Sequence, residues 1–415
     1  MTSWLFFILA IIILHYILDV TVSTLNLKAL SARLPEEFQD IFDDKKYSDS
    51  QSYTTATTHL ALIENSSSTL ITILFLLLGG FNLVDQFARS FGLNEITTGI
   101  IFTFTLLFLS FIAGLPFSIY STFSVEARFG FNRTTVKTFT ADIVKGLLLA
   151  VVIGTPILAV ILWFFENSGS YGWFFCWIGV VLFGIVLQFF APILIMPLFN
   201  KFTPLDDNEL KQKILDYADR EKFQLKGIFT MDGSKRSSKL NAFFTGFGRF
   251  RKIVFFDTLV EKLSSDEIVA VLAHEMGHFK KKHIWKMLAA SVLQTGLMFF
   301  LLSFFIKNSG LFEAFKMEAL STYASLVFFA FIYSPLNTLI SIFFNYRSRI
   351  HEFEADRYAA ETTGRSDMLI QGLKKLSKEN LSNLTPHPLM VFFSYSHPPV
   401  LSRIRTLNGM VDKLK

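Results

Sequence analysis

The apolar residues of this chain fall into runs of about twenty. A helix rises about 1.5 Å per residue, so a run of this length spans a hydrocarbon core of roughly 30 Å. Each run is apolar on all sides, as a lipid-embedded helix is. About seven runs meet this description, at residues 4–20, 68–84, 97–118, 146–165, 171–196, 287–306 and 320–344. The chain is therefore expected to be a mainly α-helical, polytopic membrane protein.

Composition narrows the possible partners and cofactors. Of the 415 residues, 51% are hydrophobic, 18% are charged and 49 are Phe, which is roughly three times the usual share of Phe. The single cysteine, Cys176, permits no intrachain disulfide and no cysteine cluster, so any metal must be held by His and carboxylate side chains. The net charge is +5, but no basic module interleaved with aromatic residues appears, so we expect no nucleic-acid partner.

Basic residues indicate the orientation in the membrane. Counting crossings places the loops after the first and third spans, the segment 197–286 and the C-terminal tail on one side. This side carries most of the Lys and Arg, including Arg128, Arg133 and Lys137 in the short third loop. By the positive-inside rule it is cytoplasmic, which puts the N-terminus outside and the C-terminus inside. The membrane would be the bacterial inner membrane or that of the endoplasmic reticulum, depending on the source.

The spans divide the chain into four regions. Residues 1–196 hold spans one to five, 197–286 form an insertion, 287–344 hold spans six and seven, and 345–415 form a C-terminal cytoplasmic region. The insertion has an α+β pattern, with helical spacing over 206–221 and strand-like alternation over 227–231 and 252–256. A second helix is expected to begin after Ser264, because Glu267 lies three residues on and completes a capping box.

This second helix contains the pattern His-Glu-x-x-His. His274 and His278 are four residues apart and share one helix face, and Glu275 lies beside them. Two imidazoles at this spacing can reach one metal ion, and a catalytic zinc needs a third protein ligand and an open position for water. Glu275 is placed to act as the general base. The alternative is a surface helix with two solvated histidines.

A second acidic cluster follows the seventh span. Glu352 and Asp356 are four residues apart and share a face, and Glu354 points elsewhere. Two crossings separate this segment from His274, so both emerge on the same side of the membrane. One carboxylate can bind the ion while the other orients a ligand imidazole. An ordinary charged helix next to the membrane is the alternative.

Two further histidines are expected to lie away from the metal. His283 is nine residues beyond His274, about two and a half turns, so it should face away and lie at the membrane interface. His351 adjoins Glu352 but points about 100° away around the helix.

These motifs together resemble a known family. The His-Glu-x-x-His motif with a later Glu-x-x-Ala-Asp is similar to the M48 gluzincin metallopeptidases. The rest of the chain resembles their Ste24 type, the CAAX prenyl proteases. That similarity lies in residues 197–205, 236–243, 253–259 and 396–399, followed by Arg403. The seven spans also match this type, whereas the shorter M48 membrane proteases have about four.

The resemblance implies a role for each matching residue. It implies one zinc ion per chain, with Glu275 as general base and acid. The zinc ligands would be His274, His278 and Glu352, Asp356 would be the carboxylate behind them, and Asn241, His397 and Arg403 would line the site. Asn241 would hold the substrate backbone, and His397 would stabilise the oxyanion. Two structural alternatives stay open: the His-Pro-Pro turn can simply end a helix, and Arg403 can pair with a structural carboxylate.

The expected activity is zinc-dependent peptide hydrolysis, in which Glu275 takes a proton from a water on the metal and returns it to the leaving amine. The resemblance also implies a chamber enclosed by the seven helices, surrounded by membrane lipid. Its substrates would be prenylated C-terminal CAAX peptides that lose their AAX tripeptide. A protease of the same chemistry for membrane-protein quality control, without prenyl specificity, is the alternative.

Two other classes of protein fit less well. A transporter or channel would need polar residues near the middle of several spans, whereas residues such as Glu126 and Asp142 lie near span ends. An inactive scaffold with a structural zinc would not require Glu275.

Overall fold

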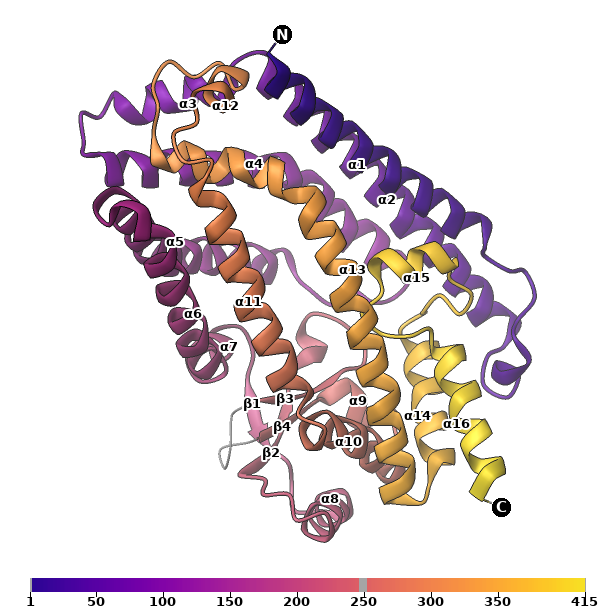
Figure 1. Ribbon diagram of the computed structural model, residues 1–415. Coiled ribbons are helices and arrows are strands. Elements are labelled where there is room, and N and C mark those ends of the chain that lie inside the picture. The colour runs from indigo at the N-terminus through magenta and orange to yellow at the C-terminus, as the bar shows by residue number, and fades with distance from the viewer. Residues whose placement is uncertain (1, 246–251, 415) are drawn as a thin grey trace.

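The computed structural model describes residues 2–245 and 252–414. Long helices form one end of the molecule, and a small sheet with shorter helices forms the other (Figure 1). Among the described residues, seven helices are long and apolar enough to cross a membrane, as predicted. They are built on α1 (Ser3–Lys28), α2 (Asp44–Leu77), α4 (Glu95–Tyr120), α5 (Val136–Asn167), α6 (Gly172–Phe190), α11 (His283–Ser303) and α13 (Thr322–Thr363).

The predicted second span, 68–84, extends beyond the end of its helix, so its C-terminal limit was wrong. Helix α2 begins at Asp44 and ends at Leu77, and residues 80–84 belong to a separate helix, α3 (Gly80–Arg89). Gly79 separates the two helices with a φ of +76°, a left-handed conformation that glycine adopts without steric cost. The apolar run continues through this break, so hydropathy alone does not reveal it.

Several shorter elements adjoin the spans. Helix α4 continues as a π-helical turn over Ser121–Glu126, and α6 continues through a similar turn, Ala191–Ile195, into α7 (Met196–Phe199). At the end remote from the sheet, α3 packs near α12 (Ser309–Ala314) (Figure 1). There the buried Asp85 accepts hydrogen bonds from the Tyr323 hydroxyl at 2.5 Å and from Arg89 Nε at 2.9 Å. This network joins α3 to α13.

The sheet has four strands in the order β1-β2-β4-β3. They are β1 (Phe202–Pro204), β2 (Gly227–Met231), β3 (Ala242–Thr245) and β4 (Lys252–Phe256). Strands β2 and β4 are the two predicted strands, and they pair in parallel with Ile228 opposite Ile253. The sequence analysis missed β1 and β3, because three or four residues are too few to show a period of two. Strand β3 begins directly after Asn241.

Helices from the insertion and the C-terminal region share one hydrophobic core with the sheet. In chain order they are α8 (Glu209–Arg220), α9 (Asp257–Lys262), α10 (Ser265–Lys280), α14 (Ser366–Glu379) and α16 (Val400–Leu414). Helix α15 (Pro388–Ser394) instead contacts α1 and α13. Ile253 of β4, Leu272 of α10 and Ile404 of α16 are fully buried in this core. The predicted capping box at Ser264 and Glu267 is present. Segments separated by two membrane spans therefore fold together.

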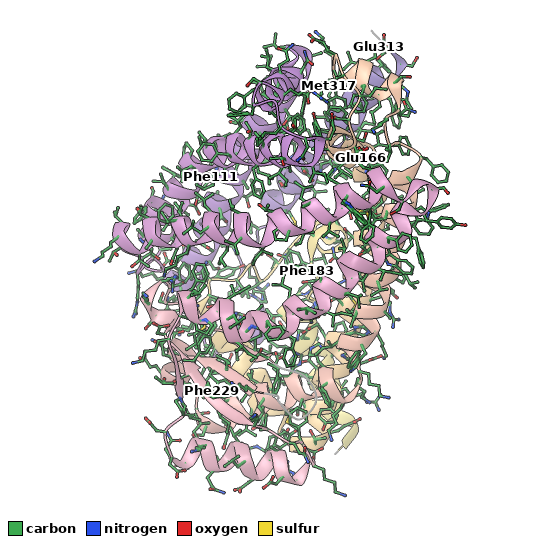
Figure 2. The ribbon with its side chains drawn as sticks, turned by 90° about the vertical axis from the view of Figure 1, so that its left-hand side faces the viewer. Phe111, Glu166, Phe183, Phe229, Glu313 and Met317 are labelled. Atoms are coloured by element: carbon green, nitrogen blue, oxygen red, sulfur yellow. The ribbon has the colours of Figure 1, made fainter. Side chains whose placement is uncertain are left out.

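The membrane helices expose apolar side chains and leave open cavities between them. Leu148 and Val152 on α5 and Leu182 on α6 are more than half exposed, as lipid-facing residues are. Figure 2 shows Phe111 of α4 and Phe183 of α6 among the membrane helices, and Phe229 on the sheet. A cavity of about 670 Å³ lies between α2, α4 and α13. A second cavity of about 450 Å³, lined by residues of α1, α2, α13 and α15, shares lining residues with the first.

Candidate metal centre

Three helices and one turn build the site. Helix α10 carries His274, Glu275 and His278, and α13 carries Glu352 and Asp356. The other members are Arg403 on α16 and His397 in the turn before it. Because α13 is a single helix of 42 residues, the acidic cluster belongs to the same helix that crosses the membrane.

A glycine permits the close approach of α10 and α13. A Cβ atom added at Gly277 would lie 2.9 Å from the Cα and 3.1 Å from the carbonyl oxygen of Ala355. Only glycine fits this contact without moving a backbone. Gly277 immediately precedes His278, and Ala355 immediately precedes Asp356. The contact therefore sets the distance between the two clusters that the sequence analysis singled out.

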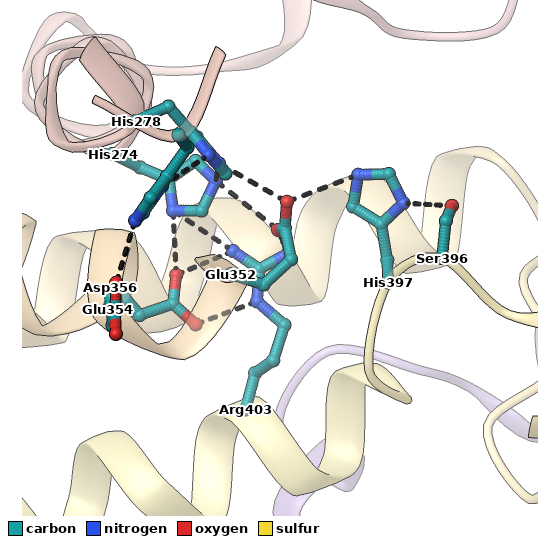
Figure 3. A network of polar contacts seen from close by, with 9 residues as sticks. His274, His278, Glu352, Glu354, Asp356, Ser396, His397 and Arg403 are labelled. Atoms are coloured by element: carbon teal, nitrogen blue, oxygen red, sulfur yellow. Dashed lines mark hydrogen bonds and ion pairs between the residues drawn. The ribbon is translucent and has the colours of Figure 1, made fainter. Parts of the chain in front are cut away.

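The ligand atoms of His274, His278 and Glu352 converge (Figure 3). The Nε2 atoms of His274 and His278 are 3.2 Å apart, Glu352 Oε1 is 3.2 Å from His278 Nε2, and Glu352 Oε2 is 3.4 Å from His274 Nε2. Ligands bound at about 2.0–2.1 Å in a tetrahedral zinc site are about 3.3–3.4 Å apart. Glu352 Oε2 is buried and accepts no hydrogen bond from the described residues. The three side chains thus fit a metal ion.

Behind these atoms lies a buried ionic network. His274 Nδ1 is 2.8 Å from Asp356 Oδ1, and Asp356 accepts hydrogen bonds from Arg403 Nε at 2.8 Å and Nη2 at 2.5 Å. Arg403 Nη1 lies 3.3 Å from Glu352 Oε2. Asp356 and Arg403 are both buried. The guanidinium therefore pairs with two carboxylates of α13.

The same network sets the protonation of His274. Burial and the nearby Arg403 lower the pKa of this imidazole, but hydrogen bonds to Asp356 and Glu352 outweigh them and raise the pKa to about 9. A metal ion requires the neutral imidazole, so a proton and a metal compete for His274.

A pocket of about 380 Å³ opens beside the ligand atoms, and it is lined in part by Asn241, Glu275, His397 and Arg403. The exposed His397 has its Nε2 3.4 Å from Glu352 Oε1, and its Nδ1 is 3.0 Å from the Ser396 hydroxyl. All eight residues singled out from the sequence thus lie in or directly behind one site.

The segment that carries Asn241 is fixed by hydrogen bonds to the side chain of Asn380. The backbone N–H of Leu240 donates to Asn380 Oδ1 at 2.8 Å, and Asn380 Nδ2 donates to the carbonyl oxygen of Leu240 at 3.1 Å. Asn380 also lines the pocket. The sequence analysis did not find this residue, because an Asn following a helix has no pattern that distinguishes it from an ordinary cap.

The expectation that His283 faces away from the site was wrong. Its Nδ1 lies 3.1 Å from His278 Nδ1, and the side chain is buried. The inference extended the helical period of α10 beyond its end. The helix stops at Lys280, Lys282 adopts a left-handed φ of +60°, and a new helix, α11, begins at His283. An amphipathic helix that runs directly into a membrane span was the available signal that the chain changes direction there.

Comparisons with known proteins agree with this geometry over the whole chain. Residues 204–411 match Peptidase family M48, and residues 23–201 match the family described as CAAX prenyl protease N-terminal, five membrane helices. The CAAX prenyl protease 1 homolog of Arabidopsis thaliana is 34% identical and is covered over 97% of each chain. CAAX prenyl protease 1 of Saccharomyces cerevisiae is also 34% identical, over 94% of this chain and 91% of its own.

A solved structure extends the likeness to three dimensions. The crystal structure of S. mikatae Ste24p superposes with a TM-score of 0.93 at 32% identity, over 98% of this chain and all of the other. The converging His-His-Glu cluster, the seven membrane helices and these matches together lead to one assignment. The chain belongs to peptidase family M48 and is a multi-pass membrane metallopeptidase of the CAAX prenyl protease type.

Proposed function

We propose that this protein is a zinc endopeptidase that removes the AAX tripeptide from prenylated C-terminal CAAX substrates. The observation that carries the proposal is the convergence of His274, His278 and Glu352 beside a pocket that Glu275 lines. Two nitrogen ligands and one carboxylate oxygen suit zinc, and three protein ligands leave a position open toward the pocket. The whole-length likeness to CAAX prenyl proteases supports the substrate class.

In this proposal each residue of the site has a separate role in hydrolysis. When bound, zinc supplies a Lewis acid for the scissile carbonyl and for a water molecule. Glu275 takes a proton from the attacking water and delivers it to the leaving amine. Asn241 holds the peptide backbone, and His397 stabilises the charge that develops on the carbonyl oxygen. Arg403 and Asp356 keep His274 and Glu352 in place.

The membrane helices would receive the lipid tail of the substrate. The 670 Å³ cavity is lined mainly by apolar side chains, among them Phe75, Leu106 and Phe331. An isoprenoid chain is favoured in such surroundings by the hydrophobic effect. We propose further that the metal site faces the cytoplasm, as the basic loops indicate, with the N-terminus on the opposite side.

One peptide pair tests the proposal. The protein, purified in detergent and loaded with zinc, is given a farnesylated CAAX peptide and its unprenylated twin, with Glu275→Gln and a chelator as controls. Zinc-dependent release of AAX with strong preference for the farnesylated peptide is the expected result. Equal cleavage of both would replace prenyl processing by general membrane-protein quality control. Cleavage of neither would refute the proposed activity.

A further inference from the structure

The two metal-ligand histidines are supported in different ways. A histidine that binds a metal usually donates its second ring N–H to an acceptor, which fixes the ring. His274 has the Asp356 carboxylate for this purpose, 2.8 Å from its Nδ1. No carboxylate among the described residues occupies the corresponding place at His278. Its Nδ1 instead faces Nδ1 of His283 at 3.1 Å.

We infer that His283 and Glu354 form a hydrogen-bonded relay that orients His278 for the metal. His283 Nε2 lies 2.7 Å from Glu354 Oε2, so the contacts run from the carboxylate through one imidazole to the next. The inference rests on the proposed metal. It assigns positioning roles to two residues that lie outside the His-Glu-x-x-His motif.

The proton positions of this relay are mutually consistent. If His278 binds the metal through Nε2, its remaining proton must be on Nδ1. His283 Nδ1 must then accept that proton's hydrogen bond, so the proton of neutral His283 is on Nε2. That N–H points to a carboxylate, which accepts hydrogen bonds only. Every donor in the relay thus has an acceptor, without any additional charge on the imidazoles.

The ring of His283 is held in a fixed plane. It stacks on the ring of His351, with centroids 4.0 Å apart and planes inclined by 10°. Both imidazoles are buried, whereas Glu354 is about two-fifths exposed. His283 is also the first residue of α11. The relay therefore joins the metal-binding helix α10 to two membrane helices, α11 and α13, at the place where they meet.

A relay role and a purely packing role for His283 predict different zinc affinities for two substitutions. His283→Phe keeps the ring and its stacking but removes both hydrogen bonds. His283→Asn loses the ring but can place an amide oxygen near the former Nδ1 position, where it accepts from His278. If the relay is correct, His283→Phe lowers zinc affinity by about 10–100-fold, and His283→Asn retains more of it. A packing role reverses this order.

The readout is zinc affinity, measured on the full-length protein in detergent by competition with a chelator of known affinity. Glu354→Leu provides a third variant at a partly exposed position, so it tests the relay even if both His283 variants fail to fold. It should weaken zinc binding, but less than His283→Phe, because water can replace the carboxylate. Glu361→Leu, which removes an exposed carboxylate from the same helix, is the matched control and should change nothing.

The outcomes separate the inference from the proposed metal. Absence of stoichiometric zinc in the wild-type protein would refute the metal site itself. Zinc binding in the wild type, with unchanged affinity in folded His283→Phe and Glu354→Leu, would refute the relay alone. An affinity order of wild type, His283→Asn and His283→Phe, from tightest to weakest, would establish it.

Discussion

The contact between Gly277 and Ala355 makes the metal site sensitive to a single methyl group. In Gly277→Ala the new Cβ would lie 2.9 Å from a backbone Cα, whereas carbon atoms pack at about 3.5–4.0 Å. The difference is about 0.6–1.1 Å. The atom it meets belongs to backbone and cannot rotate away, so α10 and α13 must separate.

This separation is large compared with what a metal tolerates. Ligand distances in metal sites vary by about 0.2 Å, and His274 and His278 lie on one of the moving helices while Glu352 lies on the other. Overpacking of this kind costs about 1–3 kcal/mol. If the cost falls on the metal-bound state, zinc affinity drops by roughly 5- to 150-fold.

Chelator competition measures this change directly, and thermal unfolding with and without zinc shows whether the cost falls on the site or on the whole fold. Gly409→Ala is the control, because it makes the same change in helix α16 with nothing within 4 Å of the new atom. Wild-type zinc affinity in Gly277→Ala, with normal unfolding, would show that the approach of the two helices does not set the ligand geometry.

Three further predictions concern the chemistry and its support. Glu275→Gln should lower turnover by about 10²–10⁴-fold while metal analysis still finds one zinc per chain; substantial turnover in a pure preparation would contradict its role. Arg403→Met should lower the free energy of unfolding by about 3–5 kcal/mol, because it removes a buried cation that contacts both Asp356 and Glu352. Denaturation of the metal-free protein measures this loss, and a loss below about 1 kcal/mol, as for an exposed pair, would contradict this role of Arg403. Asn380→Ala removes the hydrogen-bond partner of the backbone N–H and carbonyl of Leu240, and each unpaired group costs about 1–3 kcal/mol of stability. Because the segment that carries Asn241 is then less well held, peptide kinetics should show a higher KM with kcat less affected. An unchanged KM would show that this contact does not contribute to substrate binding.

Local patterns in the sequence were sufficient to predict the membrane helices and to single out three side chains that the structure brings together. Seven long apolar runs predict seven spans because a bilayer leaves few alternatives to a helix of that length. The spacing of His274 and His278 predicts a shared face because the helical period is fixed. The pairing of Glu352 with these histidines followed from counting two crossings between them, which is a topological argument and needs no coordinates.

Contacts that depend on where one helix ends and another begins were not accessible in this way. His283 was misplaced because a single left-handed residue at Lys282 resets the helical phase. The two hydrogen bonds between Asn380 and Leu240 join residues 140 positions apart, and no local sequence pattern predicts them. The same holds for β1 and β3, whose pairing partners, and not their own few residues, make them strands.

The order of the site's parts along the chain has a consequence for biosynthesis. The proposed ligand histidines lie on α10, the proposed ligand carboxylate follows two crossings later on α13, and Arg403 comes only with α16. A ribosome makes the chain in this order, so the growing polypeptide carries the His-Glu-x-x-His helix for more than a hundred residues before α16 emerges. Throughout the insertion of its membrane helices, the nascent protein therefore lacks a complete proteolytic centre. On the proposed ligand assignment, activity therefore requires that the last of these helices has already been made.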